Sequence, residues 1–180
     1  SMECCASSNF IKGLLYFLEN KVDVNICWNG TNPLFYACAF GQVDAVKLLL
    51  SLKDIKPNIK DSQGIFNHFF FNLNPLFHCI ENNQPRCLHE LLKIKDLSIK
   101  CSINGQEVSS FLFAAQEGFT ECIAELLNYP SVDVNEKNAN DWTALHAAAQ
   151  GGHLETVKYL CQSKNIIIQP KDKDGIFFYF

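Results

Sequence analysis

A periodic pattern of large apolar residues and turn residues constrains the fold of this chain more than any other feature. The apolar positions recur at separations of 42, 35 and 34 residues, at Leu34, Leu76, Phe111 and Leu145. A turn residue follows each of them and keeps the same separations: Gly41, Asn83, Gly118 and Gly152. A period of this length predicts a stack of structural repeats rather than the single globular fold of an enzyme.

Each unit of the period predicts two short helices. The first is rich in small residues, as in Ala147–Ala149, and a Gly or Asn that tolerates the left-handed conformation ends it. The second carries apolar residues at helical spacing, such as Val157 and Leu160. One such pair cannot bury its apolar face alone, so neighbouring pairs must stack. We therefore expect Leu145, Val157 and Leu160 to be buried.

The last unit carries a recognisable signature. The run Thr143-Ala-Leu-His-Ala-Ala-Ala-Gln-Gly-Gly-His-Leu-Glu-Thr-Val resembles the ankyrin repeat, and Val22–Asn25 and Val132–Asn135 look like its repeat-closing hairpin. The match is good in the first full unit and degenerate in the two middle ones. The resemblance implies an all-α fold, an ankyrin-type helix-turn-helix solenoid with hairpin fingers along one side and a concave surface that binds proteins.

The spacing of the repeats predicts that the whole chain forms a single array. We expect a partial N-terminal repeat at residues 2–26, with a first helix over 2–9 and a second over 9–18. Four repeats follow at about 27–60, 61–100, 101–136 and 137–170, and a further one starts at 171–180. Terminal repeats need polar outer faces, whereas residues 176–180 are apolar and aromatic. We therefore expect a fragment of a longer array, with Ser1-Met2 left from an expression vector.

Composition limits the partners and the setting. The net charge of −4 gives no electrostatic footprint for nucleic acid, and no apolar run is long enough for a membrane span. No signal peptide is visible. Most of the nine cysteines fall at packing positions of the repeats, where a free thiol acts as a small hydrophobe. We expect no disulfides and a reducing, cytoplasmic or nuclear setting.

The residues that could take part in catalysis or metal binding have structural explanations. The sequence contains no nucleophile elbow, phosphate-binding loop or metalloprotease motif, so we expect no catalysis, no cofactor and no small-molecule ligand. His78 and Cys79 with Cys87 and His89 offer zinc-type ligands, but they fall on core registers of different helices, so we expect no metal site. The resemblance implies a structural hydrogen-bonding role for His146, and His153 belongs to the turn between helices.

Partner contacts are expected at the finger tips and on the inner face of the first helices. Trp142 immediately precedes the Thr143-Ala-Leu-His start of the last unit, and Trp28 holds a similar place before the first full one. Phe40 lies just before the Gly41 turn, at a position that commonly faces the concave side of such arrays. Large aromatic residues are the usual anchors of protein interfaces. Alternatively, each of the three packs on its neighbouring finger as scaffold.

An aromatic insertion interrupts the period. About eight extra residues stand between Asp61 and Leu76, and they give the run Phe66-Asn-His-Phe-Phe-Phe-Asn-Leu73 directly after Ile65. One interpretation is that the phenylalanines fold back over the stack as additional core. The other is that Ile65, Phe66, Phe69 and Phe70 protrude as partner anchors, because exposed apolar patches mark interfaces.

Three functions are compatible with these observations. The first is a non-catalytic interaction module that binds a partner protein or peptide through the finger tips and the concave face. The second is a regulatory ankyrin segment of a larger enzyme, channel or effector, holding another domain of its own chain. In the third the array is itself a substrate, because Leu127 with Asp133-Val-Asn135 resembles the context of asparaginyl hydroxylation. Sequence beyond Phe180 would separate the first two.

Overall fold

The structure is a computed structural model that describes residues 2–27, 32–60, 73–103 and 106–168. Within these residues the helices, in chain order, are α1 (Met2–Glu19), α2 (Pro33–Ala39), α3 (Val43–Leu50), α4 (Pro75–Glu81), α5 (Pro85–Leu91), α6 (Ser110–Gln116), α7 (Thr120–Leu126), α8 (Ala144–Gln150) and α9 (Leu154–Cys161). Two strands, β1 (Lys100–Ile103) and β2 (Gln106–Ser109), precede α6. The expected all-α solenoid of helix pairs is confirmed.

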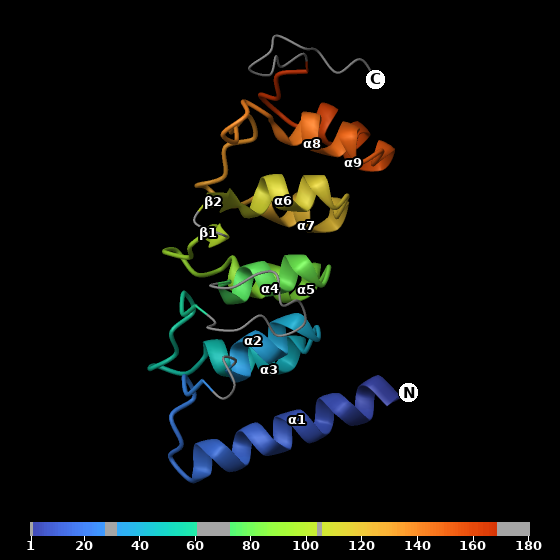
Figure 1. Ribbon diagram of the computed structural model, residues 1–180. Helices are drawn as coiled ribbons and strands as arrows, with labels where there is room; N and C mark the ends of the chain where they lie inside the picture. Colours follow the sequence, from blue (N-terminus) through green and yellow to red (C-terminus); the bar gives the residue numbers. More distant parts are fainter. Residues whose placement is uncertain (1, 28–31, 61–72, 104–105, 169–180) are drawn as a thin grey trace.

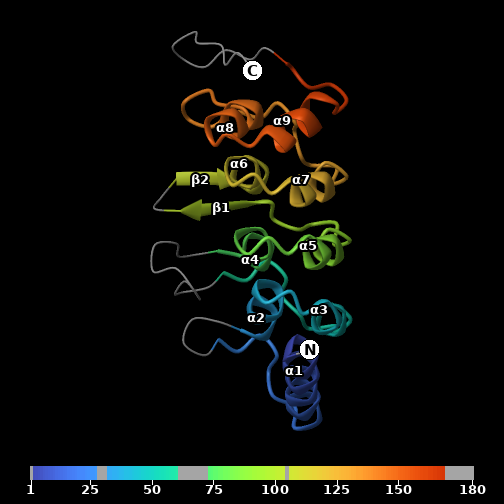
Figure 2. The ribbon, with the colours of Figure 1, turned by 90° about the vertical axis from the view of Figure 1, so that its right-hand side faces the viewer.

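The helices stack in two rows (Figures 1 and 2). Helices α2, α4, α6 and α8 form an inner row, and α3, α5, α7 and α9 form an outer row beside it. Helix α1 packs under α3 at the N-terminal end. We call the segments that join consecutive pairs the first finger (residues 20–32), second finger (51–74), third finger (92–109) and fourth finger (127–143). The described parts of all four lie along one side of the stack, to the left of the short helices in Figure 1.

Local sequence explains where the short helices begin and end. Asn32 and Asn74 cap α2 and α4 by accepting hydrogen bonds from backbone N–H groups through their side-chain oxygens, and a proline follows each cap. The predicted turn residues all have positive φ angles: Gly41, Asn83, Gly118 and Gly152. At Gly118 an added Cβ would lie 2.4 Å from Nδ1 of His153, so the glycine also allows the next repeat to pack closely against this turn.

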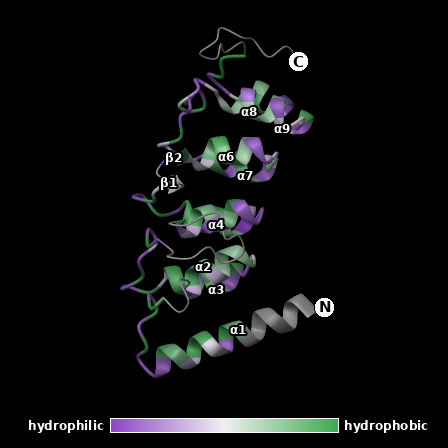
Figure 3. Ribbon diagram, in the orientation of Figure 1, coloured by the Kyte–Doolittle hydropathy of each residue, from purple (hydrophilic) through white to green (hydrophobic). Residues whose placement is uncertain are grey.

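The core runs continuously between the two rows. The repeated apolar positions Leu34, Leu76, Phe111 and Leu145 are all buried, and Val157 and Leu160 are buried as predicted. Small residues such as Ala114 and Ala148 lie between them and let the helices approach closely. Hydrophobic stretches recur in each helix pair, whereas the finger turns are largely hydrophilic (Figure 3). Stacking of adjacent pairs is therefore the main source of stability.

Asparagine side chains join neighbouring fingers. Asn25 donates to the carbonyl oxygen of Asp54 at 2.8 Å and accepts from the N–H of Lys56 at 2.9 Å. Asn58 makes the same pair of bonds to the third finger, and Asn135 makes it to residues 165 and 167. At the corresponding position between Asn58 and Asn135 stands Lys100, which instead pairs with Glu107 across the β1–β2 hairpin. The joint between the third and fourth fingers is therefore built differently.

Two local expectations need correction. The predicted helix pair at residues 2–18 is a single helix, α1. The turn at Asn83 is followed by Pro85, which disfavours a helical residue before it, whereas neither proline nor glycine adjoins Asn9. Strand pairing within the described residues is confined to the third finger. Val22–Asn25 and Val132–Asn135 form turns, in which Asp23 and Asp133 accept the N–H of the residue two positions later.

Candidate functional site

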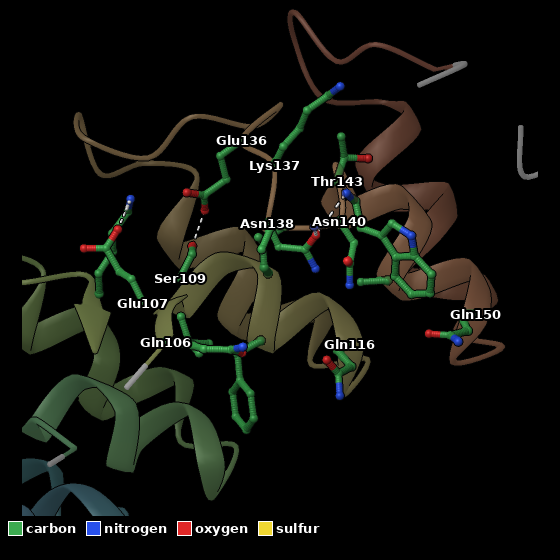
Figure 4. Close-up of a pocket in the computed structure, with 17 residues that line it drawn as sticks. Gln106, Glu107, Ser109, Gln116, Glu136, Lys137, Asn138, Asn140, Thr143 and Gln150 are labelled. Carbon is green, nitrogen blue, oxygen red and sulfur yellow. Dashed lines mark hydrogen bonds and ion pairs between the residues drawn. The ribbon is translucent and has the colours of Figure 1, made fainter. Parts of the chain in front are cut away.

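A cavity of about 670 Å³ opens on the inner face between the third and fourth fingers (Figure 4). Its walls come from β2, the inner helices α6 and α8, and the fourth finger. The lining residues include Phe113, Gln116, Glu136, Trp142, Ala147 and Gln150. The cavity therefore spans two adjacent repeats, and neither repeat forms it alone.

A small residue in α8 leaves room for the cavity. Ala147 occupies the repeat position that holds Tyr36 in α2, His78 in α4 and Phe113 in α6. In the earlier repeats these larger side chains take part in ring contacts, with Phe35 lying 5.2 Å from His78 and Phe77 lying 6.1 Å from Phe113. Only a methyl group projects at this position in α8, so the inner face remains hollow beside Phe113.

Trp142 forms an aromatic wall and is held by the turn that precedes it. Its backbone N–H donates to Oδ1 of Asn138 at 3.0 Å, and its carbonyl oxygen accepts the N–H of Asn138 at 3.0 Å. Asp141 adopts a positive φ of 61° within this turn. The indole ring stacks on His146 with ring centres 6.4 Å apart. The wall is therefore preorganised, which lowers the entropic cost of binding.

Glu136 places a half-buried carboxylate at the cavity. It accepts a hydrogen bond from the hydroxyl of Ser109, the residue that caps α6 (Figure 4). Burial raises the pKa of Glu136, and the hydrogen bond from Ser109 and the charge of Lys100 oppose this shift only in part. The lysines that line the cavity have other acidic partners: Lys100 lies 3.0 Å from Glu107, and Lys137 lies 3.9 Å from Asp141.

Carboxamide side chains supply much of the remaining polar lining: Gln106, Gln116, Asn138, Asn140 and Gln150. Gln116 and Gln150 occupy the same position in α6 and α8, so they present equivalent groups on successive inner helices. Within the described part of the chain, neither of these two side chains makes a hydrogen bond. Each carboxamide can both donate and accept, which suits the alternating polar groups of an extended polypeptide backbone.

The structure places the predicted contact residues in different regions. Trp142 lines the cavity, whereas Phe40 caps α2 and lies with its ring centre 4.2 Å from that of Tyr36. Phe40 is 43% exposed and belongs to an aromatic cluster with Tyr36 and Phe10 near the N-terminal end. The remaining candidates lie outside the described residues: Trp28, Ile65, Phe66, Phe69 and Phe70.

Sequence reasoning missed Glu136, Phe113, Gln116 and Gln150. A comparison of side-chain size across the aligned repeats could have found the cavity, because Ala147 replaces larger residues at one register. Glu136 follows Asn135 in a finger turn and resembles any solvated acidic residue in sequence. Its burial depends on Ser109, which lies 27 residues earlier in the chain. No local pattern indicates that contact.

Histidine and cysteine residues occupy packing and joint positions. Nδ1 of His146 lies 3.0 Å from Oγ1 of Thr143 at the start of α8, and Nε2 of His153 bonds the carbonyl oxygen of Gln116 in the preceding repeat. Burial raises the pKa of Cys122 to about 12. The free thiols among the side chains that the structure describes are Cys27, Cys38, Cys79, Cys87, Cys101, Cys122 and Cys161. Among the described residues, none form a cluster of three or more potential metal ligands. No helix in the described ranges is both long and apolar enough to cross a bilayer.

Comparison with known families agrees with this architecture. The family model for ankyrin repeats (three copies) matches residues 2–61 and 76–174, which is most of the chain. The chain belongs to the ankyrin-repeat family. Residues 62–75, which the model leaves unmatched, contain the aromatic insertion.

Similar proteins carry this array within longer chains. An ankyrin repeat-containing protein of Schizosaccharomyces pombe is 28% identical over 79% of this chain and 44% of its own length. The leucine-rich repeat serine/threonine-protein kinase 1 of Caenorhabditis elegans is 25% identical, with 82% of this chain and 7% of the kinase covered. An L-asparaginase of Dirofilaria immitis is 30% identical over 87% of this chain and 25% of the asparaginase. The ankyrin array spans less than half the length of each of these relatives.

Proposed function

We propose that this ankyrin array binds an extended segment of a partner protein in the cavity between the third and fourth fingers. The observation that supports this most directly is the hollow at Ala147, lined by the aromatic rings of Phe113 and Trp142. Rigid aromatic walls with a few polar groups are typical of peptide-binding sites. Family membership adds support, because ankyrin repeats are generally protein-interaction modules.

Gln116 and Gln150 suggest how such a segment would lie. They mark equivalent points on α6 and α8, so a chain that meets both must cross from one repeat to the next. An extended backbone offers N–H and C=O groups in alternation, and the two carboxamides can bond both kinds. The apolar surfaces of Phe113 and Trp142 would then cover side chains of the segment. Affinity would arise from the aromatic walls, and orientation from the carboxamides.

Filling the hollow tests this proposal. Ala147→Tyr installs the residue that α2 carries at the same register, so the ring should occupy the cavity while the helix pair remains folded. The control is Lys158→Phe, which adds a ring on the outer helix α9, where the lysine side chain is exposed. A phage-displayed library of random dodecapeptides, selected on the unmodified array, supplies the ligands. Binding should be lost with Ala147→Tyr and kept with Lys158→Phe.

Two results would contradict the proposal. Selected peptides that bind folded Ala147→Tyr and the unmodified array equally well would show that the cavity is not the site. Failure of the unmodified array to select any peptide above background would also count against an extended ligand. Circular dichroism of both variants ensures that a loss of binding reflects the filled cavity and not unfolding.

A second candidate is a regulatory segment of a larger enzyme, in which the cavity holds another part of the same polypeptide. The similarity to a kinase and to an asparaginase favours it, since each contains a matching array in a much longer chain. The coding sequence on both sides of this segment discriminates between the two candidates. A catalytic signature there would favour intramolecular regulation, and further repeats alone would favour a separate partner.

A further inference from the structure

The charges around the cavity are unevenly paired. Lys100 and Lys137, the cations among its lining residues, lie within 4 Å of Glu107 and Asp141 respectively. Among the described residues, no lysine or arginine comes within that distance of Glu136, and its hydrogen-bond donor is the neutral hydroxyl of Ser109. The cavity therefore contains one half-buried carboxylate that pairs directly with no described cation and meets the charge of Lys100 only at longer range.

A buried carboxylate without a counter-charge is energetically unfavourable unless a ligand supplies one. Partial removal from water penalises the ionised form of Glu136, and the direction of its pKa shift is consistent with this penalty. A cation that entered the cavity would meet a carboxylate already stripped of part of its hydration. Electrostatic attraction is stronger in such a setting than on an open surface.

The carboxylate of Glu136 suits a planar cation in particular. Pairs of arginine and carboxylate are frequently bidentate, with two parallel N–H bonds from the guanidinium group. The side-chain oxygens of Gln106, Gln116 and Gln150 add acceptors on other walls of the cavity. Arginine carries five N–H donors in a fixed plane and is less strongly hydrated than lysine, so it can satisfy several acceptors at once.

We propose that the cavity selects partner segments that carry an arginine side chain, whose guanidinium pairs with Glu136. This inference rests on the proposed function, because it names the chemistry that the same cavity recognises. The ligand is a polypeptide of a partner protein with a cationic residue flanked by apolar side chains. Glu136 sets the preference for charge, and Phe113 and Trp142 bind the apolar neighbours.

A cycle of protein and ligand variants tests the pairing. Peptides selected on the unmodified array should be enriched in arginine, and one of them is synthesised with citrulline, which has nearly the same shape and no charge, in place of that arginine. The citrulline peptide should bind the unmodified array about tenfold more weakly or worse, since hydrogen bonds between charged groups exceed neutral ones. With Glu136→Gln the two peptides should bind nearly equally.

Glu155→Gln is the matched control. Glu155 lies on α9 outside the cavity and is exposed and paired with Lys158, so its replacement removes one negative charge and should leave the preference for arginine intact. The proposal is overturned if citrulline binds as well as arginine, or if Glu136→Gln leaves their affinity ratio unchanged. Peptides without arginine that Ala147→Tyr still excludes would overturn this inference alone and leave the cavity as the binding site.

Discussion

The N-terminal and C-terminal halves of the inner face share one backbone plan but differ in how their side chains fill it. In the N-terminal half, Tyr36 stacks on Phe10 and His78 packs beside Phe35, so large rings occupy the repeated position. In the C-terminal half that position is Phe113 in α6 but Ala147 in α8, and at α8 a cavity replaces the ring. Side-chain volume at one register therefore decides whether a stretch of the array is closed scaffold or open site.

The fingers differ between the same two halves. Asn25 and Asn58 bind the first three fingers to one another through paired side-chain to backbone hydrogen bonds. The next joint has Lys100 at the corresponding position, and contact passes instead through Ser109 and Glu136 at the cavity. The open cavity thus coincides with the joint that lacks the asparagine bridge, which suggests that binding and bridging compete for the same part of the finger.

The largest effect is expected from emptying the core beneath the open half. Leu145→Ala removes a buried side chain of α8 and should lower the free energy of unfolding by about 2–5 kcal/mol. The stability of each repeat depends on its own packing and on its contacts with adjacent repeats. Helices α8 and α9 should therefore lose hydrogen-exchange protection before α2 and α3 do. Leu154→Ala, at a position 61% exposed on α9, is the control and should cost little. If hydrogen-exchange protection in Leu145→Ala fell equally in all helices, the two halves would unfold together and not one before the other.

An intermediate effect is expected from the finger joints. Asn25→Ala removes two hydrogen bonds between fingers at a buried side chain, and should cost about 1–3 kcal/mol in denaturant unfolding. Lys100→Ala changes the corresponding position of the open joint, where only a surface ion pair with Glu107 is lost, and should cost no more than about 1 kcal/mol. Equal losses for the two variants would mean that both joints are held alike.

The backbone plan of the array was easier to predict from sequence than the packing of its side chains. Turn positions such as Gly41 and Gly118 follow from local chemistry and a fixed period, and both have the positive φ that the pattern indicates. Trp142 was recognised as a contact candidate because it precedes a strong repeat signature. Glu136 was missed because its environment depends on Ser109 in another repeat. The single helix α1 was missed because Asn9 is compatible with both a turn and a helix interior.

The smallest effect concerns Glu136, the feature that most distinguishes the open half. Burial raises the pKa of this carboxyl, so the folded chain binds its proton more readily than the unfolded chain does. The resulting stabilisation is complete below the unfolded-state pKa and is lost as the pH rises through the folded-state pKa. The unmodified array should therefore gain stability relative to Glu136→Gln as the pH falls from neutrality toward 4.5, the ordinary pKa of this carboxyl.

Denaturant unfolding of the two proteins at a series of pH values measures this difference. Glu155→Gln removes one negative charge at an exposed position on α9, outside the cavity, and controls for the change in net charge. A difference that stays constant with pH, or that shifts in favour of Glu136→Gln as the pH falls, would show that the carboxylate is not penalised in the fold. In that case the open half would carry no electrostatic cost for a cationic ligand to relieve. The expected shift would instead identify Glu136 as a group whose ionised form is disfavoured in the free array and available to a positively charged partner.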